Sequence, residues 1–441
     1  MPDKVGSDNH KPTSLQAISI KAGYSRKHRF QDLYRCLDES FLQESFYRMN
    51  RKAAPGVDQQ TWRDYKADLD GNIRNLVERL KAGQYRARLI RRHYIPKATG
   101  GRRPLGIPVI EDKLLQTAVS RLLQAIWEPA FLPCSFGYRP KVGARDAVKM
   151  LKVNLQFGKY GYVVEADIKG FFDTINHSWL LKMLSLRIDD RRLLHLVGKW
   201  LKAGVLEEAG QVVHPATGTP QGGVISPVLA NIYLHYVLDV WFEKAVKASA
   251  AGKALLCRYA DDFVCAFQYR KEAEAFYQAL PERLGKFSLA VSPAKTDMIR
   301  FSRFHPSHQR SFKFLGFAFY WSEDRQGEAR VRTVTARDRL QGSLREFSVW
   351  IKAKRHLPKG LFFAALSAKL RGYNNYFGIR GNSHALTRFY WLAMRVLFKW
   401  LNRRSQRISM NWEKFKRLLE RLKIPKAQVK KQPFTKRSVF A

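Results

Sequence analysis

Acidic residues are scarce in this chain of 441 residues, which has 37 Asp and Glu against 79 Lys and Arg, for a formal net charge of +42. An excess of this size resists compaction through self-repulsion unless a polyanion neutralises it. The sequence pI near 10.3 makes nucleic acid the expected partner. An anionic membrane surface would instead favour one basic amphipathic helix, whereas Lys and Arg are spread along the whole chain here.

Cysteine is also rare, with four residues and no C-x-x-C pair. The sequence therefore indicates neither a zinc knuckle nor a disulfide framework, and it fits a reducing compartment. No run reaches the roughly 18 apolar residues of a membrane span, and the first thirty residues have no apolar core of the signal-peptide type. We expect a cytoplasmic protein without a membrane partner, with cores built from the 45% of residues that are hydrophobic.

Hydrophobic periodicity predicts a mixture of helices and short strands, followed by a purely helical segment. Helices are expected at about 72–82, 178–202, 227–247 and 272–284. Strands are expected at Tyr162–Ile168, Leu255–Arg258, Phe263–Phe267 and Lys313–Tyr320. Three amphipathic helices are expected at about 336–355, 360–377 and 384–402. This change of pattern predicts a domain boundary near 325–335.

Three acids stand at the ends of expected strands. Asp167 ends a buried strand, and Asp261 and Asp262 occupy the turn of an expected hairpin. Taken singly, the doublet fits an ordinary polar turn, and Asp167 fits a helix cap or a paired structural acid. Together they would repel one another unless a cation neutralised them. Nucleotidyl transfer uses two divalent ions of the magnesium type, which prefer carboxylates with phosphate and water oxygens.

The segment Tyr259-Ala260-Asp261-Asp262, between two apolar strands, resembles the YxDD box of reverse transcriptases. The alanine in the second position of this box, Ala260, resembles the residue found there in group II intron-encoded enzymes and their bacterial relatives. Other blocks resemble those of the same family and follow in its order: Lys52–Asp58, Arg91–Pro108, Ser135–Pro140, Glu165–Phe172, Gly218–Pro227, Leu289–Thr296, Phe314–Phe317 and Arg371–Phe377. The resemblance covers about residues 30–400, and the ordered series is far more specific than any single block.

The resemblance implies an α+β right-hand polymerase followed by an all-α thumb. The expected parts are a flexible basic arm at 1–29, an N-terminal extension and fingers at 30–140, a palm with an antiparallel sheet and the catalytic site at 141–328, a three-helix thumb or maturase domain at 329–402, and a basic tail, a possible DNA-binding segment, at 403–441. Some members continue into an endonuclease domain with His and Cys ligands. That spacing does not occur here, so we do not expect this chain to cleave a target strand.

The resemblance also implies how the catalytic metals are held. Asp167, Asp261 and Asp262 are expected to be catalytic and to hold two Mg²⁺ ions, for which Mn²⁺ can substitute, and Ile168 is expected to offer its backbone carbonyl. Within this group, Asp262 is usually a supporting acid.

Four further residues are expected to bind the incoming nucleotide. Lys97 and Arg103 match the positions that grip the triphosphate, although a hairpin rich in Lys and Arg also fits solvated charge. Phe172 matches an aromatic residue that excludes a ribose 2′ hydroxyl, although a core Phe is the alternative. Gln221 and the glycines after it allow the backbone to approach the nucleotide, and a tight turn fits the same residues.

Nucleic-acid contacts are expected at Lys295, Arg371 and Tyr373, against the alternatives of a surface lysine and of a helical bundle with a solvated face.

The implied function is RNA-directed DNA synthesis from an RNA template, a DNA primer and dNTPs, with binding of a structured intron RNA to assist splicing and mobility. The alternatives are a related enzyme recruited to DNA repair or phage defence, and a non-catalytic RNA-binding maturase. Ala260 and Phe172 disfavour an RNA-dependent RNA polymerase. The oligomeric state stays open.

Overall fold

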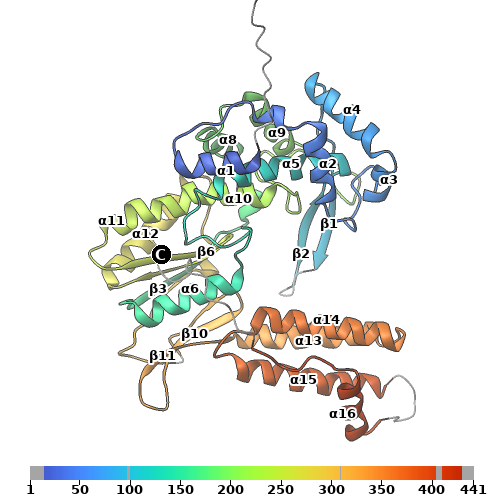
Figure 1. Ribbon diagram of the computed structural model, residues 1–441. Helices are drawn as coiled ribbons and strands as arrows, with labels where there is room; N and C mark the ends of the chain where they lie inside the picture. Colours follow the sequence, from blue (N-terminus) through green and yellow to red (C-terminus); the bar gives the residue numbers. More distant parts are fainter. Residues whose placement is uncertain (1–13, 97–99, 308, 404–409, 430–441) are drawn as a thin grey trace, which may run out of the picture. The chain divides into compact units, whose positions relative to one another are not determined.

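The computed structural model describes residues 14–96, 100–307, 309–403 and 410–429 (Figure 1). The fold is α+β, with antiparallel strand pairs and many helices. The chain divides into two compact units, each assembled from segments that are distant in sequence. The first unit comprises residues 1–140, 168–245 and 279–292, and the second comprises residues 141–167, 246–278 and 293–441.

The first unit is mainly helical. Its helices are α1 (Leu15–Tyr24), η1 (Leu33–Cys36), α2 (Glu39–Tyr47), α3 (Trp62–Ala67), α4 (Leu69–Lys81), α5 (Ile110–Trp127), α7 (Phe171–Thr174), α8 (His177–Ser185), α9 (Arg191–Leu201), α10 (Ser226–Leu234) and the π-helical turn η2 (His235–Asp239). A second π-helical turn, η3 (Phe242–Val246), and α12 (Arg270–Gly285) each continue from one unit into the other. Buried apolar side chains occur on all sides of α5, which makes it the central helix of this unit.

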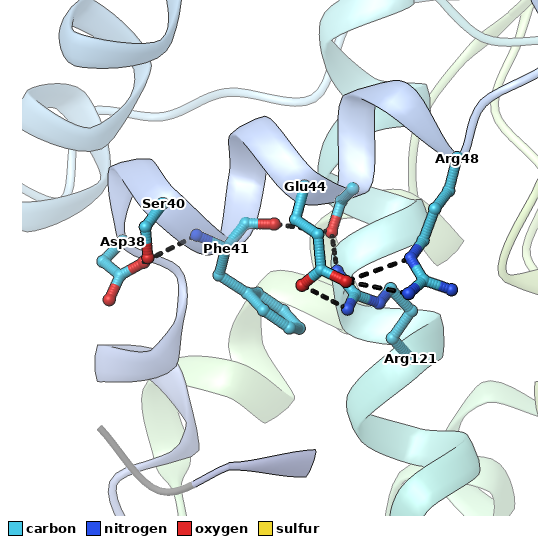
Figure 2. A network of polar contacts seen from close by, with 7 residues as sticks. Asp38, Ser40, Phe41, Glu44, Arg48 and Arg121 are labelled. Atoms are coloured by element: carbon cyan, nitrogen blue, oxygen red, sulfur yellow. Dashed lines mark hydrogen bonds and ion pairs between the residues drawn. The ribbon is translucent and has the colours of Figure 1, made fainter. Parts of the chain in front are cut away.

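Helix α2 is attached to α5 by a charged network as well as by apolar packing (Figure 2). The guanidinium of Arg121, on α5, donates to Ser45 Oγ at 2.7 Å and pairs with Glu44 at 2.6 Å. Glu44 also pairs with Arg48 at 2.8 Å, and both arginines hold the pKa of its carboxyl below the usual range. Arg121 further lies 4.4 Å from the centre of the Phe41 ring. The network satisfies a largely buried cation on the central helix, so we interpret it as structural.

A four-stranded sheet of the first unit carries the expected nucleotide-binding hairpin. Its order is β2 (Arg102–Ile107), β1 (Ile90–Pro96), β4 (Val205–Leu206) and β5 (Val212–Val213). Strands β1 and β2 pair antiparallel, with Ile95 opposite Arg103. Strand β4 pairs parallel with β1, which brings residues 205–206 beside a strand more than a hundred positions earlier.

The second unit contains a four-stranded antiparallel sheet in the order β6 (Ala254–Tyr259), β7 (Asp262–Phe267), β3 (Tyr162–Asp167) and β8 (Asp297–Arg300). Strand β7 is buried from Phe263 to Phe267, which fits its position inside the sheet. Helix α6 (Ala144–Phe157) packs on β6, and the short helices α11 (Lys247–Ser249) and η4 (Pro293–Lys295) also belong to this unit. The three catalytic candidates therefore lie at the ends of strands that packing holds firmly.

A three-stranded sheet and a helical bundle complete the second unit. The sheet has the order β11 (Ala329–Thr335), β10 (Phe317–Glu323) and β9 (Phe312–Phe314). The helices are α13 (Arg337–Lys354), α14 (Lys359–Phe377), α15 (Ser383–Leu401) and α16 (Trp412–Arg421). Buried Asn382 joins the sheet to the bundle, because its amide donates to Thr335 Oγ1 and to the Phe377 carbonyl, each at 2.8 Å. The expected helices at 336–355, 360–377 and 384–402 are confirmed.

Two expected elements are each split in the structure. The single strand expected at Lys313–Tyr320 is instead the pair β9 and β10, since Leu315 and Gly316 both have positive φ and reverse the chain. The helix expected at 178–202 is instead α8 and α9, which Asp190 separates by accepting from Leu193 N at 3.0 Å as an N-cap.

Two terminal segments for which no helix was predicted contain helices. Within the arm expected at 1–29, α1 begins at Leu15 after Ser14, whose hydroxyl accepts from Ala17 N, and it buries Ile18 and Ala22. Residues 1–13 lie outside the described residues. In the tail, Asn411 caps α16 in the same way, and Phe415 is fully buried. The expected fingers, palm and thumb ranges stay predictions.

None of the helices in the described part of the chain is both long enough and apolar enough to span a membrane.

Candidate active site

Asp167 and Asp262 lie directly opposite each other on neighbouring antiparallel strands, at the end of β3 and the start of β7. Asp261 precedes Asp262 in the two-residue loop that joins β6 to β7. The structure therefore brings together, within one sheet, acids that are almost a hundred positions apart in sequence. Like charges placed directly opposite in a sheet destabilise it.

The electrostatics of Asp262 reflect this crowding. Burial, first, and then the carboxylates of Asp167, Glu165 and Asp261 together raise its pKa to about 7, although Lys295 opposes them. Glu165 lies two residues before Asp167 on β3 and therefore on the same face of the sheet. Its pKa is also raised by burial. A divalent cation would stabilise the ionised forms of these groups.

Lys295 is the cation nearest to this cluster. Its Nζ donates to Asp167 Oδ2 at 2.7 Å, although about two thirds of the lysine side chain is exposed. This bond raises the pKa of Lys295, and the neighbouring carboxylates of Asp262 and Asp261 add to the effect. The expected nucleic-acid contact at Lys295 thus lies beside the acids.

A cavity of about 670 Å³ opens in front of these carboxylates. Its charged lining comes from strands β3, β7, β8 and β9, from η4, and from the start of α13. The charged residues are Glu165, Asp167, Asp262, Lys295, Asp297, Lys313, Asp338 and Arg339. Lys313 Nζ pairs with Asp338 at 3.1 Å, so both signs of charge line the walls. A cavity with this lining suits a charged, hydrated ligand better than an apolar one.

By themselves, the acids supply only some of the ligands that a magnesium-type cation needs. Among the described residues, no group of three or more His, Cys, Asp or Glu side chains is arranged to hold a metal ion. However, Mg²⁺ is commonly bound through one or two carboxylates together with substrate phosphates and water, without an all-protein cage. Asp167 and Asp262 supply such a pair of hard oxygen donors. Ile168 is buried and bridges to Val291 in the first unit.

The loop that carries Asp261 is held in an uncommon conformation. Ala260 has φ 58°, in the left-handed region, as the first loop position of a tight hairpin often requires. The fully buried Arg258 donates from its guanidinium to the Ala260 carbonyl at 3.0 Å. Sequence reasoning missed Arg258, although an arginine that ends the predicted apolar strand Leu255–Arg258 is itself a signal, because a buried cation needs a specific partner.

Within the first unit, the structure brings Phe172 next to the segment that contains Gln221. Thr219 N donates to the Phe172 carbonyl at 2.7 Å, and Gly218 N donates to the Ile175 carbonyl at 2.7 Å. Gly218 has φ 90°, and a Cβ there would lie 2.9 Å from the Phe172 carbonyl oxygen. Glycine is therefore needed for this close approach.

The nucleotide-binding hairpin joins the same group. Gly106 N, on β2, donates to the Gln221 carbonyl at 2.5 Å. Arg103 lies three residues earlier on β2 with its side chain exposed. Lys97, the other expected phosphate contact, lies outside the described residues. Backbone hydrogen bonds thus link the segments that carry Arg103, Phe172 and Gln221.

Tyr138 is a further residue of this group that sequence reasoning did not single out. Its ring meets Phe172 edge-on at 6.3 Å, its side chain is about half exposed, and its backbone has φ 57°. The block Ser135–Pro140 pointed to this segment but not to this side chain.

The two residues expected in the helical region lie in different environments. Arg371 is exposed on α14. Tyr373 stacks on Phe389 with ring centres 3.5 Å apart and packs against the core of the bundle, and this burial raises its pKa to about 12. Tyr373 is therefore in a position to stabilise the bundle, whatever else it contacts.

Comparison with known proteins supports the resemblance. Residues 95–319 match the family model of reverse transcriptase (RNA-dependent DNA polymerase). The chain is 40% identical over 230 residues to group II intron-encoded protein LtrA of Lactococcus lactis subsp. cremoris, a match that covers 51% of this chain and 38% of that protein. It is 34% identical over 307 residues to protein YkfC of Escherichia coli, covering 63% of this chain and 78% of that protein.

A third relative is an uncharacterized 91 kDa protein in the cob intron of Schizosaccharomyces pombe, 29% identical over 379 residues that cover 70% of this chain and 46% of that protein. Half of the chain matches the family model, and most of protein YkfC is covered at more than 30% identity. The chain therefore belongs to the reverse transcriptase family, as a member similar to group II intron-encoded proteins.

Proposed function

We propose that this chain is an RNA-directed DNA polymerase that extends an annealed DNA primer along an RNA template. The observation that carries the proposal is the pairing of Asp167 with Asp262 at the end of two adjacent strands, with Asp261 next to them in the hairpin. Membership of the reverse transcriptase family supports it. Mutually repelling acids are a poor choice for stability, so a cation-dependent reaction accounts for them better than packing does.

In the proposed reaction, the primer 3′ oxygen bonds to the α-phosphorus of a dNTP while the bond to the pyrophosphate oxygen breaks. Pyrophosphate departs, and the hydroxyl proton passes to water. Two Mg²⁺ ions, or Mn²⁺ in their place, would activate the hydroxyl and neutralise the triphosphate when bound. Asp167, Asp261 and Asp262 would hold them, with the Ile168 carbonyl as a further oxygen donor. Lys295 would then give up its bond to Asp167 and be available to a phosphate of the nucleic acid.

The residues of the first unit would receive the nucleotide. Arg103, with Lys97, would neutralise the triphosphate, because preorganised cations stabilise charge that develops during phosphoryl transfer. Phe172 would form the wall that excludes a 2′ hydroxyl, with Tyr138 supporting its ring from the edge. Gln221 would contact the nucleotide through its backbone, because Gly222 allows the chain to approach the nucleotide closely.

In a right-hand description, the β1–β2 hairpin would belong to the fingers, the β6-β7-β3-β8 sheet would form the palm, and α13, α14 and α15 would form the thumb. Arg371 would contact the template–primer backbone. The number of strands and the strand order given above are compatible with this assignment, which rests on the family.

We further propose that the enzyme binds a structured intron RNA and assists its splicing and mobility. The similarity to group II intron-encoded protein LtrA motivates this role, although the match covers 38% of that protein. A role in DNA repair or phage defence uses the same chemistry and is the alternative.

Primer extension tests the proposal. An RNA template with an annealed DNA primer, dNTPs and Mg²⁺ is expected to give full-length product with the wild type and none with an Asp261→Ala, Asp262→Ala double variant. Omitting the metal is expected to abolish the product as well. A folded wild type that binds RNA but extends no primer would refute the polymerase and leave a non-catalytic maturase as the better description.

A further inference from the structure

The outer face of α15 carries a row of exposed basic residues around one exposed tryptophan. Trp391 is 57% exposed. His384, Arg388, Arg395 and Lys399 are also exposed and lie three or four positions apart, which places all five residues on one side of the helix. We call these five residues the α15 stripe. By helix geometry, Arg388 and Arg395 are separated by about 10 Å along the axis, with Trp391 between them.

The opposite face of α15 already has a structural role. Phe389, Ala393 and Leu397 are buried in the core that α13, α14 and α15 share. Trp391 is therefore not an uncovered edge of the apolar face that packs into the core. It is the one large apolar side chain on the α15 stripe, which argues against a membrane surface, because interfacial helices bury a continuous apolar face.

Helix α16 supports the tryptophan from the side. Trp412 begins α16 and lies 6.2 Å from Trp391 between ring centres. Trp412 itself packs on Phe398 at 5.0 Å and on Phe415 at 5.2 Å, and Phe415 is fully buried. Trp391 is thus held beside a fixed aromatic cluster, so little side-chain freedom is lost when a ligand stacks on it.

The segment of sequence that contains the α15 stripe is strongly basic. Residues 347–412 contain no Asp or Glu and 13 Lys and Arg, although acids occur on both sides, at Glu346 and Glu413. A second copy of this chain, at +42, would be repelled by such a surface. A polyanion would be attracted, and an exposed aromatic ring between arginines is the arrangement that stacks an unpaired base while cations hold the adjacent phosphates.

We propose that the α15 stripe binds an unpaired nucleic-acid strand, with one base stacked on Trp391 and phosphates held by Arg388 and Arg395. A duplex does not satisfy this surface, since its bases are already stacked and its backbone alone would use only the cations. The site is separate from the carboxylate cluster, and it does not require the chain to synthesise DNA.

Photocrosslinking tests the proposal with the full chain. Single-stranded 20-nucleotide RNA and DNA carrying 5-iodouracil, and the corresponding duplexes, are irradiated with the protein, and crosslinked peptides are mapped by mass spectrometry. We expect the single strands, but not the duplexes, to crosslink at the peptide that contains Trp391. The single strand that crosslinks more strongly shows whether the site prefers RNA or DNA.

Matched variants measure the contribution of the ring. In fluorescence anisotropy at raised salt, Trp391→Ala is expected to weaken single-strand binding by about 5-fold or more, while Trp391→Phe keeps most of it. Phe157→Ala, which removes a similarly exposed aromatic at the end of α6 in the same unit, is expected to have no effect. Arg388→Ala is expected to reduce the salt dependence by about one unit of slope.

Clear outcomes would overturn the proposal. One is an absence of crosslinks on α15. Another is a Trp391→Ala protein that melts like the wild type and binds the single strand like Phe157→Ala. The Asp261→Ala, Asp262→Ala variant is expected to crosslink normally, so failure of the polymerase and failure of this site can be told apart.

Discussion

Lys295 Nζ donates to Asp167 Oδ2 at 2.7 Å, so a side-chain cation occupies the carboxylate that the proposed function assigns to a metal ion. The two residues come from η4 and from the end of β3, 128 positions apart. The ion pair partly neutralises a cluster of acids, and any divalent ion that binds Asp167 has to displace it or share it.

Replacing Lys295 by Gln is therefore expected to strengthen divalent-ion binding in the absence of nucleic acid, by a few-fold, because an exposed ion pair contributes only about 1 kcal/mol or less. Titration with Mn²⁺, followed by electron paramagnetic resonance, measures the change. Lys313→Gln is the matched control, since Lys313 lines the same cavity but pairs with Asp338. Equal affinities in the two variants would show that Lys295 does not compete with the metal.

Asp262→Asn is expected to stabilise the fold while it abolishes primer extension. The substitution removes one of two carboxylates placed directly opposite each other, which should raise the free energy of unfolding by about 0.5–2 kcal/mol in EDTA. Urea unfolding measures the gain. With Mg²⁺ present the difference should shrink, because the ion stabilises the wild type. A loss of stability in EDTA would mean that the repulsion is already relieved within the protein.

Phe172→Ala is expected to admit ribonucleotides. Removing the ring takes away the proposed wall against the 2′ hydroxyl, so the preference for dNTP over rNTP should fall by roughly tenfold or more in single-nucleotide extension. Phe172→Tyr retains the wall and serves as the control. An unchanged preference in an active Phe172→Ala enzyme would return Phe172 to the role of a packing residue.

Gly218→Ala is expected to lower the free energy of unfolding more than an ordinary glycine substitution does. A Cβ at Gly218 would lie 2.8 Å from the Asp173 carbonyl oxygen, whereas at Gly210, with a similar φ of 85°, nothing lies within 4 Å. Gly210→Ala therefore carries only the backbone cost, and Gly218→Ala should lose about 1–3 kcal/mol more in urea unfolding. The dNTP KM should also rise, because the Gln221 segment must shift. Equal losses would refute the close approach.

Asp112 should make stability depend on pH. It is almost fully buried on α5, accepts from the Tyr85 hydroxyl at 2.6 Å, and burial raises its pKa to about 7. Between about pH 4 and 7 the folded state therefore binds more protons than the unfolded state, so this residue's contribution to stability falls as pH rises and then levels off.

The measurement is urea unfolding of the wild type and Asp112→Asn from pH 4 to 8. The wild type should lose about 1–3 kcal/mol relative to the variant over this range. Parallel curves would show that the carboxylate ionises in the folded protein as easily as in the unfolded chain.

The order of the sequence blocks was sufficient to identify the family and the α+β class, because each block has a local pattern that can be read directly. It also pointed to three acids that the structure brings together, and their catalytic role stays a prediction. The strand ending at Asp167 and the hairpin around Asp261 were predicted within one or two residues. The turn at Leu315–Gly316 was missed, since positive φ at a leucine leaves no composition signal.

Local sequence alone determined which residues carry charge, where strands end and where helices begin, since alternation, capping and apolar periodicity act over a few residues. Only the tertiary structure decided what those residues meet. It placed Asp262 opposite Asp167, gave Lys295 its carboxylate partner, buried Arg258 beneath the hairpin, and directed Tyr373 toward the core while Trp391 stays in solvent. Strand register and helix rotation set these relationships, and both depend on packing between segments that are distant along the chain.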